Sequence, residues 1–530
     1  MHDDMQIIRQ LDFEKCIYDG QIPCRWTPDL GYEYGYPLFN FYPPLPYIIG
    51  QIFRFLQFSF IDTIKLVAAT QIILTAVFMY ILAKSLTGRL GGIVSAIFYT
   101  YAPYHAVNIY IRGAMNEAWA STFFPLVLYF IRKLILKPNI ENIFGLAISF
   151  NAILLSHNPM AMIFAPICLI WAIFWILESK NIKNTLIYKN LFLSAILSLS
   201  LTSFFTLPLL FETKLVQVDS MFSGYYNYSV HFATFYQLFI SNFWGDGPSV
   251  WGIDDKMSFM IGYLHWIIPL IMFILSSIKY YKTKKNIYLI PLGLFIFGLG
   301  YAFMAHERST FIWMLISPIQ KVQFPWRFLN IVIFIMSLTV AYIGLFIKNR
   351  IIILLLIISV ILINFQYFYP IHSGPISDSQ KLSGESWRLL TTASIYDYLP
   401  KTAKIAGKKA AQPYLDEITP NSTKYEISGQ KKGTDWVFYN LNLKSEAMIT
   451  LPVLGFPNFK LFDFGKEIKY SIEPELGRIT VNLSAGDHQL YLKLFNTSIR
   501  TTANIISLLA WSLIITYYLY SLWKKLKLKK

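Results

Sequence analysis

The placement of the basic residues constrains this chain most, because they gather in short clusters between long apolar runs. Clusters such as Lys84 with Arg89 and Lys348 with Arg350 occupy alternate gaps, and the chain ends in a lysine-rich tail, 524–530. The other gaps carry Asp, Glu, His, Arg and aromatic residues instead. Since short loops rich in Lys and Arg stay on the cytoplasmic side of a membrane, the alternation predicts a multipass membrane protein.

The composition agrees with this prediction. Of the 530 residues, 55% are hydrophobic and only 14% are charged, a balance that soluble globular domains do not have. The formal net charge is +16, but the lysines sit in predicted cytoplasmic loops and leave no basic stripe, which argues against a nucleic-acid partner. Three cysteines are too few for a disulfide scaffold. Cys16 and Cys24 share one loop, where they could pair or both stay free.

About eleven apolar runs are candidates to cross the bilayer as helices, which takes about 20 residues each. Counting back from the cytoplasmic tail places the segments 1–60, 212–256, 305–323 and 370–500 outside. The predicted spans are 62–84, 90–104, 114–131, 140–155, 159–177, 191–211, 259–278, 287–303, 328–347, 351–368 and 505–523.

Two segments do not fit a simple count of crossings. The apolar stretch 43–60 is short and holds three prolines and a central Arg54, so we expect a helix lying in the outer interface, with a true crossing as the alternative. The segment before it is placed outside although no signal peptide or helix precedes it. We expect that a first transmembrane helix has been lost from this sequence; unaided translocation of the N-terminus is the alternative.

The segment 370–500 is polar and shows period-two alternation. The runs 477–484 and 486–494 predict a β-hairpin, and 436–439 and 447–452 predict further strands. The predicted fold is therefore an all-α polytopic membrane bundle with an extracytoplasmic β-sandwich-like domain. Its expected parts are a first outer loop with interfacial helices (1–60), the transmembrane bundle (61–369), the β-rich domain (370–500), and a last span with a basic cytoplasmic tail (501–530).

The N-terminal motif His2-Asp3-Asp4 puts two adjacent carboxylates next to the membrane. Such groups can remove a proton from a hydroxyl group, or hold a divalent cation such as Mg²⁺ or Mn²⁺. A solvated acidic pair is the alternative. One short motif cannot supply an octahedral coordination sphere alone, so we do not expect a required metal.

Three further outer motifs place polar groups at the ends of predicted spans. Arg112 and Glu117 open one span, where Glu117 is either functional or simply favoured by the helix dipole in the first turn. His157 lies in a turn before Pro159, and Arg327 enters another span. Arginine suits bidentate phosphate binding, although each such residue alone is more typical of an interfacial anchor. Their convergence on one membrane face indicates a site.

At these residues the chain resembles bacterial multipass proteins described as 6-pyruvoyl-tetrahydropterin synthase-related. These are close to the YfhO-like membrane proteins, which are regarded as glycosyltransferases of the GT-C fold. The family usually has a transmembrane helix before the first motif, and the sequence lacks the His-rich zinc spacing that pterin-synthase chemistry would need. The matching elements, spread over nearly the whole chain, are His2-Asp-Asp, Gln21-Ile-Pro-Cys-Arg-Trp, Gly31-Tyr-Glu-Tyr-Gly-Tyr-Pro-Leu-Phe-Asn-Phe-Tyr-Pro-Pro-Leu-Pro-Tyr, Arg112-Gly with Glu117, His157-Asn, Gln323-Phe-Pro-Trp-Arg, Tyr396-Asp-Tyr-Leu-Pro, Leu454-Gly-Phe-Pro-Asn-Phe and Ala485-Gly-Asp-His.

The resemblance implies a lipid-linked sugar donor and an acidic catalytic base in the first outer loop. We therefore expect a glycosyltransferase of the bacterial plasma membrane that moves a sugar from a polyprenyl-phosphate donor to a cell-envelope acceptor at the outer face. The alternatives are a transporter or flippase of lipid-linked glycans, and a non-catalytic scaffold that displays the β-domain. The expected catalytic residues are Asp3, Asp4 and Glu117, and the expected substrate-binding residues are Arg112, His157, Arg327 and Arg25.

Overall fold

The computed structural model describes residues 2–252 and 254–527, and it divides into two compact units. Each unit joins segments that lie far apart in the sequence. The first combines the N-terminal residues through Asp4 with Lys65–Leu201 and Phe222–Pro375. The second combines Met5–Ile64, Thr202–Met221 and the described residues from Ile376 onward.

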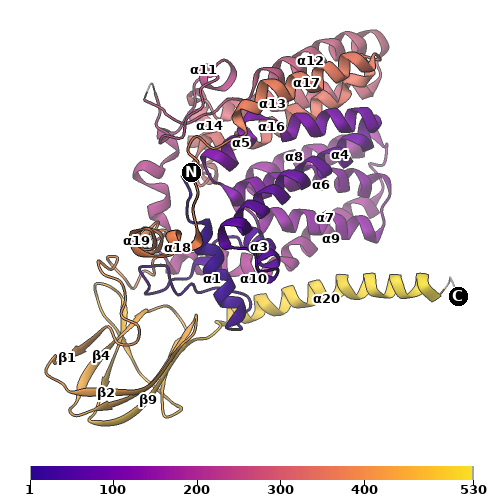
Figure 1. The fold of residues 1–530 in the computed structure, drawn as a ribbon. Coiled ribbons are helices and arrows are strands. Elements are labelled where there is room, and N and C mark those ends of the chain that lie inside the picture. The colour runs from indigo at the N-terminus through magenta and orange to yellow at the C-terminus, as the bar shows by residue number, and fades with distance from the viewer. Residues whose placement is uncertain (1, 253, 528–530) are drawn as a thin grey trace. The chain divides into compact units, whose positions relative to one another are not determined.

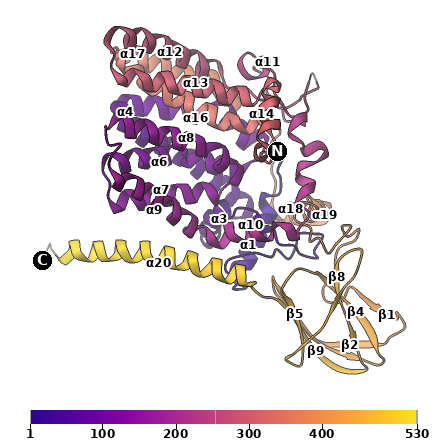
Figure 2. The ribbon, with the colours of Figure 1, turned by 180° about the vertical axis from the view of Figure 1, so that it is seen from behind.

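The first unit is a bundle of apolar helices. The helices are α4 (Phe60–Thr100, whose first turn belongs to the second unit), α5 (Pro103–Ala106), α6 (Met115–Leu136), α7 (Ile140–Leu154), α8 (Asn158–Glu178), α9 (Thr185–Leu201), α11 (Phe235–Phe239), α12 (Tyr263–Thr283), α13 (Leu289–Met304), α14 (Thr310–Leu315), α15 (Ser317–Gln320), α16 (Leu329–Val340) and α17 (Arg350–Asn364). In Figures 1 and 2, α6, α7 and α9 lie side by side, as do α12 and α13. The core includes the stacked rings of Phe124 and Phe164, whose centroids are 4.1 Å apart.

Eight helices in the described part of the chain are long and apolar enough to cross a membrane, or nine if α9 and the following Ser203–Leu215 form one bent span. The prediction of about eleven spans is therefore not confirmed. Each of the eleven predicted runs does contain a helix, but α7 has only 15 residues. In addition, the two predicted spans 62–84 and 90–104 fall largely on the single element α4.

The element α4 is broken at Gly88, and this break explains part of the difference in span number. Gly88 has φ 85 and ψ −175. This conformation lies outside the helical region, and glycine adopts it readily because it has no Cβ atom. A Cβ atom on Gly92 would lie 2.8 Å from the Tyr80 ring, although twelve residues of continuous helix would separate these positions by about 18 Å. The chain therefore turns back at Gly88.

The second unit combines helices with two antiparallel sheets (Figure 1). Helix α3 buries Tyr47 and Gly50 but exposes the apolar side chains of Ile48, Ile52 and Phe55, a pattern that suits a helix lying at a membrane interface. The helices are α1 (Gln6–Tyr18), α2 (Leu38–Phe41), α3 (Leu45–Phe55), α10 (Ser203–Glu212), α18 (Asp378–Lys381), α19 (Gly384–Thr392) and α20 (Ser498–Lys527). The strands are β1 (Glu417–Thr419), β2 (Tyr425–Lys432), β3 (Trp436–Leu443), β4 (Ala447–Leu454), β5 (Phe459–Asp463), β6 (Lys466–Ile468), β7 (Ser471–Ile472), β8 (Arg478–Leu483) and β9 (Gly486–Leu494).

The strand order of the two sheets corrects one prediction. One sheet has the order β1-β4-β8-β7 and the other β2-β3-β9-β5-β6. The strands β8 and β9 were expected to form a hairpin, yet β8 pairs with β4 and β7 while β9 pairs with β3 and β5. Period-two alternation locates a strand and its buried face, but it does not identify the partner strand. The hairpin prediction is therefore wrong, although both strands exist.

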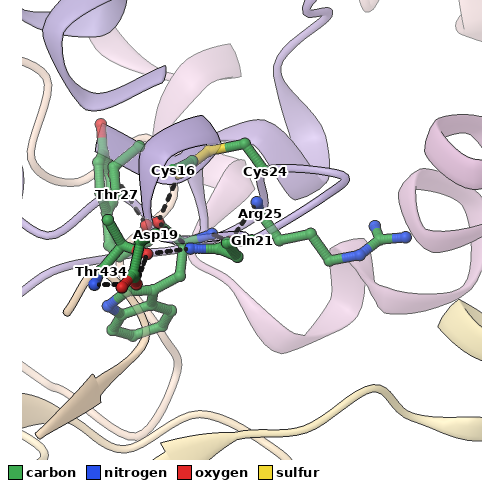
Figure 3. The surroundings of a disulfide bond; sticks show 9 residues. Cys16, Asp19, Gln21, Cys24, Arg25, Thr27 and Thr434 are labelled. Carbon is green, nitrogen blue, oxygen red and sulfur yellow. Dashed lines mark hydrogen bonds between the residues drawn. A yellow bond between two sulfur atoms is a disulfide. The ribbon is translucent and has the colours of Figure 1, made fainter. Parts of the chain in front are cut away.

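A disulfide closes the loop that follows α1. Cys16 is bonded to Cys24, eight residues further along the chain. Within the closed loop, Gln21 accepts hydrogen bonds from the backbone N–H groups of Arg25 (2.6 Å) and Trp26 (2.8 Å). The Asp19 carboxylate accepts one from the backbone N–H of Thr434 at 2.7 Å, which ties the loop to the turn before β3 (Figure 3). These contacts hold the loop against the β-rich part of the same unit.

Maleimide-PEG labelling of the denatured protein tests this pairing. Without reductant, one cysteine (Cys168) is expected to react, and after reduction all three, because Cys168 is free in the structure. Replacing Cys16 and Cys24 together by Ala is expected to lower the free energy of unfolding by about 2–3 kcal/mol, since the cross-link closes a short loop. The variant Cys168→Ala, which leaves the disulfide intact, is the matched control. Three reactive thiols before reduction would contradict the pairing.

Candidate functional site

Arg112 and Glu117 meet at a break between two helices of the first unit. After α5, a short π-helical turn (Val107–Ile111) leads to Gly113, whose φ of 63 allows the chain to turn before α6 begins. Arg112 then donates from Nη1 and Nη2 to the two carboxylate oxygens of Glu117, at 2.7 and 2.8 Å. This is the bidentate pairing that a guanidinium and a carboxylate favour.

Arg327 reaches the same carboxylate from a distant part of the sequence. It lies in the 3-10 turn Pro325–Phe328, directly before α16. Its Nε donates to Glu117 Oε2 at 3.0 Å, and its Nη1 donates to the backbone oxygen of Val322 at 2.6 Å. Glu117 is only 1% exposed. The structure therefore brings together three residues that the sequence placed on one membrane face.

Two asparagines complete this network, and the sequence analysis did not single them out. Asn330 donates to Glu117 Oε1 at 2.6 Å, and Asn108 donates to Asn330 at 2.6 Å and accepts from Arg112 at 2.6 Å. Asn330 lies at the start of the apolar helix α16, where a buried polar side chain is a signal that could have pointed to it. Together the five side chains form the Arg112–Glu117–Arg327 network.

The N-terminal motif docks directly on this network. The backbone N–H of His2 donates to the oxygen of Ile111 at 3.0 Å, and that of Asp3 to the oxygen of Arg112 at 2.9 Å. The imidazole Nε2 of His2 lies 2.6 Å from the backbone oxygen of Asp246. Asp3 is partly buried and Asp4 is exposed. The backbone of the acidic motif is thus tied to the backbone of the segment that carries Arg112.

His157 lies at the N-terminus of α8 and interacts electrostatically with Glu117 and Arg327. Its Nδ1 accepts a hydrogen bond from the backbone N–H of Met160 at 3.3 Å. Burial lowers the pKa of His157 to about 3, and the positive charge of Arg327 acts in the same direction. The ring is therefore neutral at physiological pH and offers a single N–H donor, at Nε2.

The charges of the network do not cancel. Two guanidinium groups face one carboxylate, so the cluster carries an excess of one positive charge. Although burial opposes the charged form, the Glu117 carboxylate raises the pKa of Arg112 above its usual value. The ring of Trp326 lies 5.9 Å from the Arg112 guanidinium, and the ring of Phe324 lies 4.8 Å from that of Arg327. This arrangement attracts an anion to a pair of fixed cations.

Arg25 belongs to the second unit, where it forms a comparable cluster with Glu212 and Arg500. Arg25 donates to Asn40 (2.9 Å) and to Asn504 (2.7 Å), while Glu212 accepts from Asn40 (2.9 Å) and Arg500 (2.8 Å). Figure 3 shows the Arg25 guanidinium pointing away from the disulfide. Burial, and then the charge of Arg500, lower the pKa of Arg25 to about 9. Sequence reasoning named Arg25 but missed Glu212 and Arg500.

Metal binding was considered for Asp3 and Asp4. Among residues 2–252 and 254–527, no group of three or more His, Cys, Asp or Glu side chains has a geometry suited to hold a metal ion. Structural and catalytic metal sites in proteins usually draw on several such ligands. The expectation that Asp3 and Asp4 need no metal stays a prediction.

Comparison with known proteins places the chain in a family. Residues 39–371 match the family model described as "6-pyruvoyl-tetrahydropterin synthase related domain; membrane protein". The chain belongs to this family. It is also similar to an uncharacterized protein of Lactococcus lactis subsp. cremoris (strain MG1363), with 24% identity over 284 residues, which are 52% of this chain and 45% of that relative. The matching part thus spans about half the length of this relative.

The matched region includes most of the site. Arg112, Glu117, His157 and Arg327 all lie within residues 39–371, whereas Asp3, Asp4 and Arg25 lie before it. Membership of a membrane-protein family and the apolar helices together indicate a membrane-embedded protein.

Proposed function

We propose that this member of the 6-pyruvoyl-tetrahydropterin synthase-related family is a YfhO-like, GT-C-type membrane glycosyltransferase. It transfers a sugar from a polyprenyl-phosphate donor to a cell-envelope acceptor at the outer face of the bacterial plasma membrane. The observation that carries the proposal is the docking of Asp3 on the backbone of Arg112, with a hydrogen bond of 2.9 Å. This contact supports the proposal because it ties a motif whose carboxylates can accept a proton to the segment that carries Arg112, a residue suited to bind a phosphate.

The proposed step is an inverting displacement at the anomeric carbon. An acceptor hydroxyl oxygen attacks this carbon, and Asp3 or Asp4 takes the hydroxyl proton as the sugar gains oxocarbenium character. The bond between the anomeric carbon and the phosphate oxygen breaks, and polyprenyl phosphate leaves with the electron pair. Arg112 and Arg327 stabilise the negative charge that forms on this phosphate. Glu117 holds both arginines in place, and the neutral His157 supplies a hydrogen bond.

The disulfide is consistent with an outer position of the second unit's first loop, because disulfides form and persist in oxidising compartments outside the cytoplasm. Nucleotide-linked sugars are not available there, so a lipid-linked donor fits an outer site.

Purified protein in proteoliposomes with a radiolabelled polyprenyl-phosphate sugar tests this function. We expect free polyprenyl phosphate and label on the acceptor fraction from a cell-envelope extract. A flippase would instead move the intact labelled lipid across the bilayer without cleaving it. A scaffold protein would do neither, so each alternative gives a different result.

A further inference from the structure

A cavity of about 400 Å³, partly open to solvent, lies in the first unit between α11 and the loop that leads to α12. This volume is in the range typical of small-molecule sites. Hydrogen bonds hold the loop in shape: Ser258 donates to the backbone oxygen of Phe243 at 2.7 Å and accepts from the N–H of Gly245 at 2.9 Å. The backbone N–H of Ile261 donates to the oxygen of Leu238 at 3.0 Å. The cavity walls are therefore preformed.

The lining combines aromatic rings with polar groups. The rings of Tyr236 and Phe243 line the cavity and are 61% and 47% exposed. Asp255 and Gln237 provide a carboxylate and an amide in the same lining. A sugar ring has one apolar C–H face and a rim of hydroxyl groups, so rings beside a carboxylate and an amide match both of its surfaces.

The two oxygens of the Asp255 carboxylate differ in their hydrogen bonding. Its Oδ1 accepts a hydrogen bond from the backbone N–H of Met257 at 3.1 Å. Its Oδ2 is buried and accepts no hydrogen bond of normal geometry from the residues that the structure describes. A buried carboxylate oxygen without a donor is costly, and a ligand hydroxyl would supply that donor. The Gln237 side chain and the backbone of Val250 lie close enough to favour the charged form of the carboxyl group.

The cavity adjoins the Arg112–Glu117–Arg327 network. Phe259, which lines the cavity, packs on Trp326 with ring centroids 5.4 Å apart, and Trp326 in turn packs on Arg112. The loop that forms the cavity also holds His2 through the backbone oxygen of Asp246. One aromatic layer thus separates the cavity from the arginines that are proposed to bind the donor phosphate.

We propose that this cavity binds a sugar residue of the acceptor glycan and that Asp255 accepts a hydrogen bond from one of its hydroxyl groups. This inference rests on the glycosyltransferase proposal, because it assigns the second substrate of the same site. It makes Asp255 a residue that positions the acceptor, separate from the proton-accepting carboxylates of the N-terminal motif.

Saturation-transfer NMR on the full chain in nanodiscs tests the proposal, with maltose, cellobiose and N,N′-diacetylchitobiose as probes. We expect at least one of them to bind, and Asp255→Asn to weaken that binding about 10- to 100-fold, as expected for a lost hydrogen bond to a charged group. Tyr236→Ala should also weaken it, while the exposed neighbour variant Asp254→Asn should not. Thermal unfolding of each variant shows whether the fold is kept.

The pH dependence adds a readout that a purely structural role would not change. Burial raises the pKa of Asp255 to about 6, so wild-type binding should weaken as the pH falls through 6, whereas binding to Asp255→Asn should stay level. Of the other titratable groups, Tyr225 interacts electrostatically with Asp255 and stays neutral in this range.

Two results would overturn the proposal: binding of the disaccharides that is unaffected by Asp255→Asn, or binding of farnesol but of none of the disaccharides. The measurement uses no donor. The protein could bind the disaccharides through Asp255 and yet never cleave a polyprenyl-phosphate sugar. That result would support the sugar site and contradict the glycosyltransferase proposal.

Discussion

Replacing both Asp3 and Asp4 by Asn is expected to lower the rate of sugar transfer by about 10²- to 10⁴-fold, the usual contribution of a general base. Asparagine keeps the size and the polarity of the side chain but cannot take the proton of the acceptor hydroxyl. The backbone hydrogen bond from Asp3 to Arg112 stays available in the variant. Donor binding should therefore change little, and the loss should appear in kcat.

The single variants Asp3→Asn and Asp4→Asn then identify the base, since only one of them should reproduce the full loss. Asp254→Asn, an exposed acidic residue of another loop of the first unit, is the control and should keep wild-type activity. Full activity in the double variant would exclude the N-terminal carboxylates as catalytic groups.

The second large effect is expected for Glu117→Gln. This change should lower the free energy of unfolding by about 3–5 kcal/mol, because it leaves two buried guanidinium groups without their carboxylate. In the wild type, the Glu117 carboxylate accepts hydrogen bonds from Arg112, Arg327 and Asn330. The amide NH₂ group of glutamine is itself a donor and would face one of these donors. Activity should fall as well, since both arginines lose their fixed position.

Denaturant titration of the purified protein measures this loss. The matched control is Glu467→Gln, which removes an exposed ion pair: Lys460 Nζ lies 3.1 Å from Glu467 Oε2, and the Glu467 side chain is 55% exposed. Exposed pairs contribute at most about 1 kcal/mol. Wild-type stability of Glu117→Gln together with lost activity would mean that Glu117 acts in the chemistry itself and not as the partner that positions the arginines.

Charge and hydropathy were sufficient to predict where the helices lie. They were not sufficient to predict how many of these helices are long enough to cross the membrane. The run from Phe60 to Thr100 shows why: its two halves are both apolar, and only the φ of Gly88 decides that the chain turns back there. The β-rich domain shows the same limit. Alternation located β8 and β9, while their partners, β4 and β3, depend on packing between strands that sequence periodicity does not encode.

Only part of the candidate site could be predicted from the sequence, and the reason is physical. Arg112, Glu117 and Arg327 open two spans from one predicted face, so the topology alone could place them near each other. Arg25 lies on the same predicted face, yet the structure assigns it to the second unit with Glu212 and Arg500. A single sequence does not show which buried arginine pairs with which glutamate.

The glycosyltransferase proposal requires the site to face outward, and impermeant thiol labelling of intact cells tests this most directly. Single cysteines at Ser229, Ser422 and Thr283, all exposed positions, are introduced into a Cys168→Ala background with the disulfide intact. We expect Ser229→Cys and Ser422→Cys to react, and Thr283→Cys to react only after the membrane is permeabilised, because it lies among the lysines 279–285. A protected Ser422→Cys together with a reactive Thr283→Cys would place the site inside and contradict the proposed function.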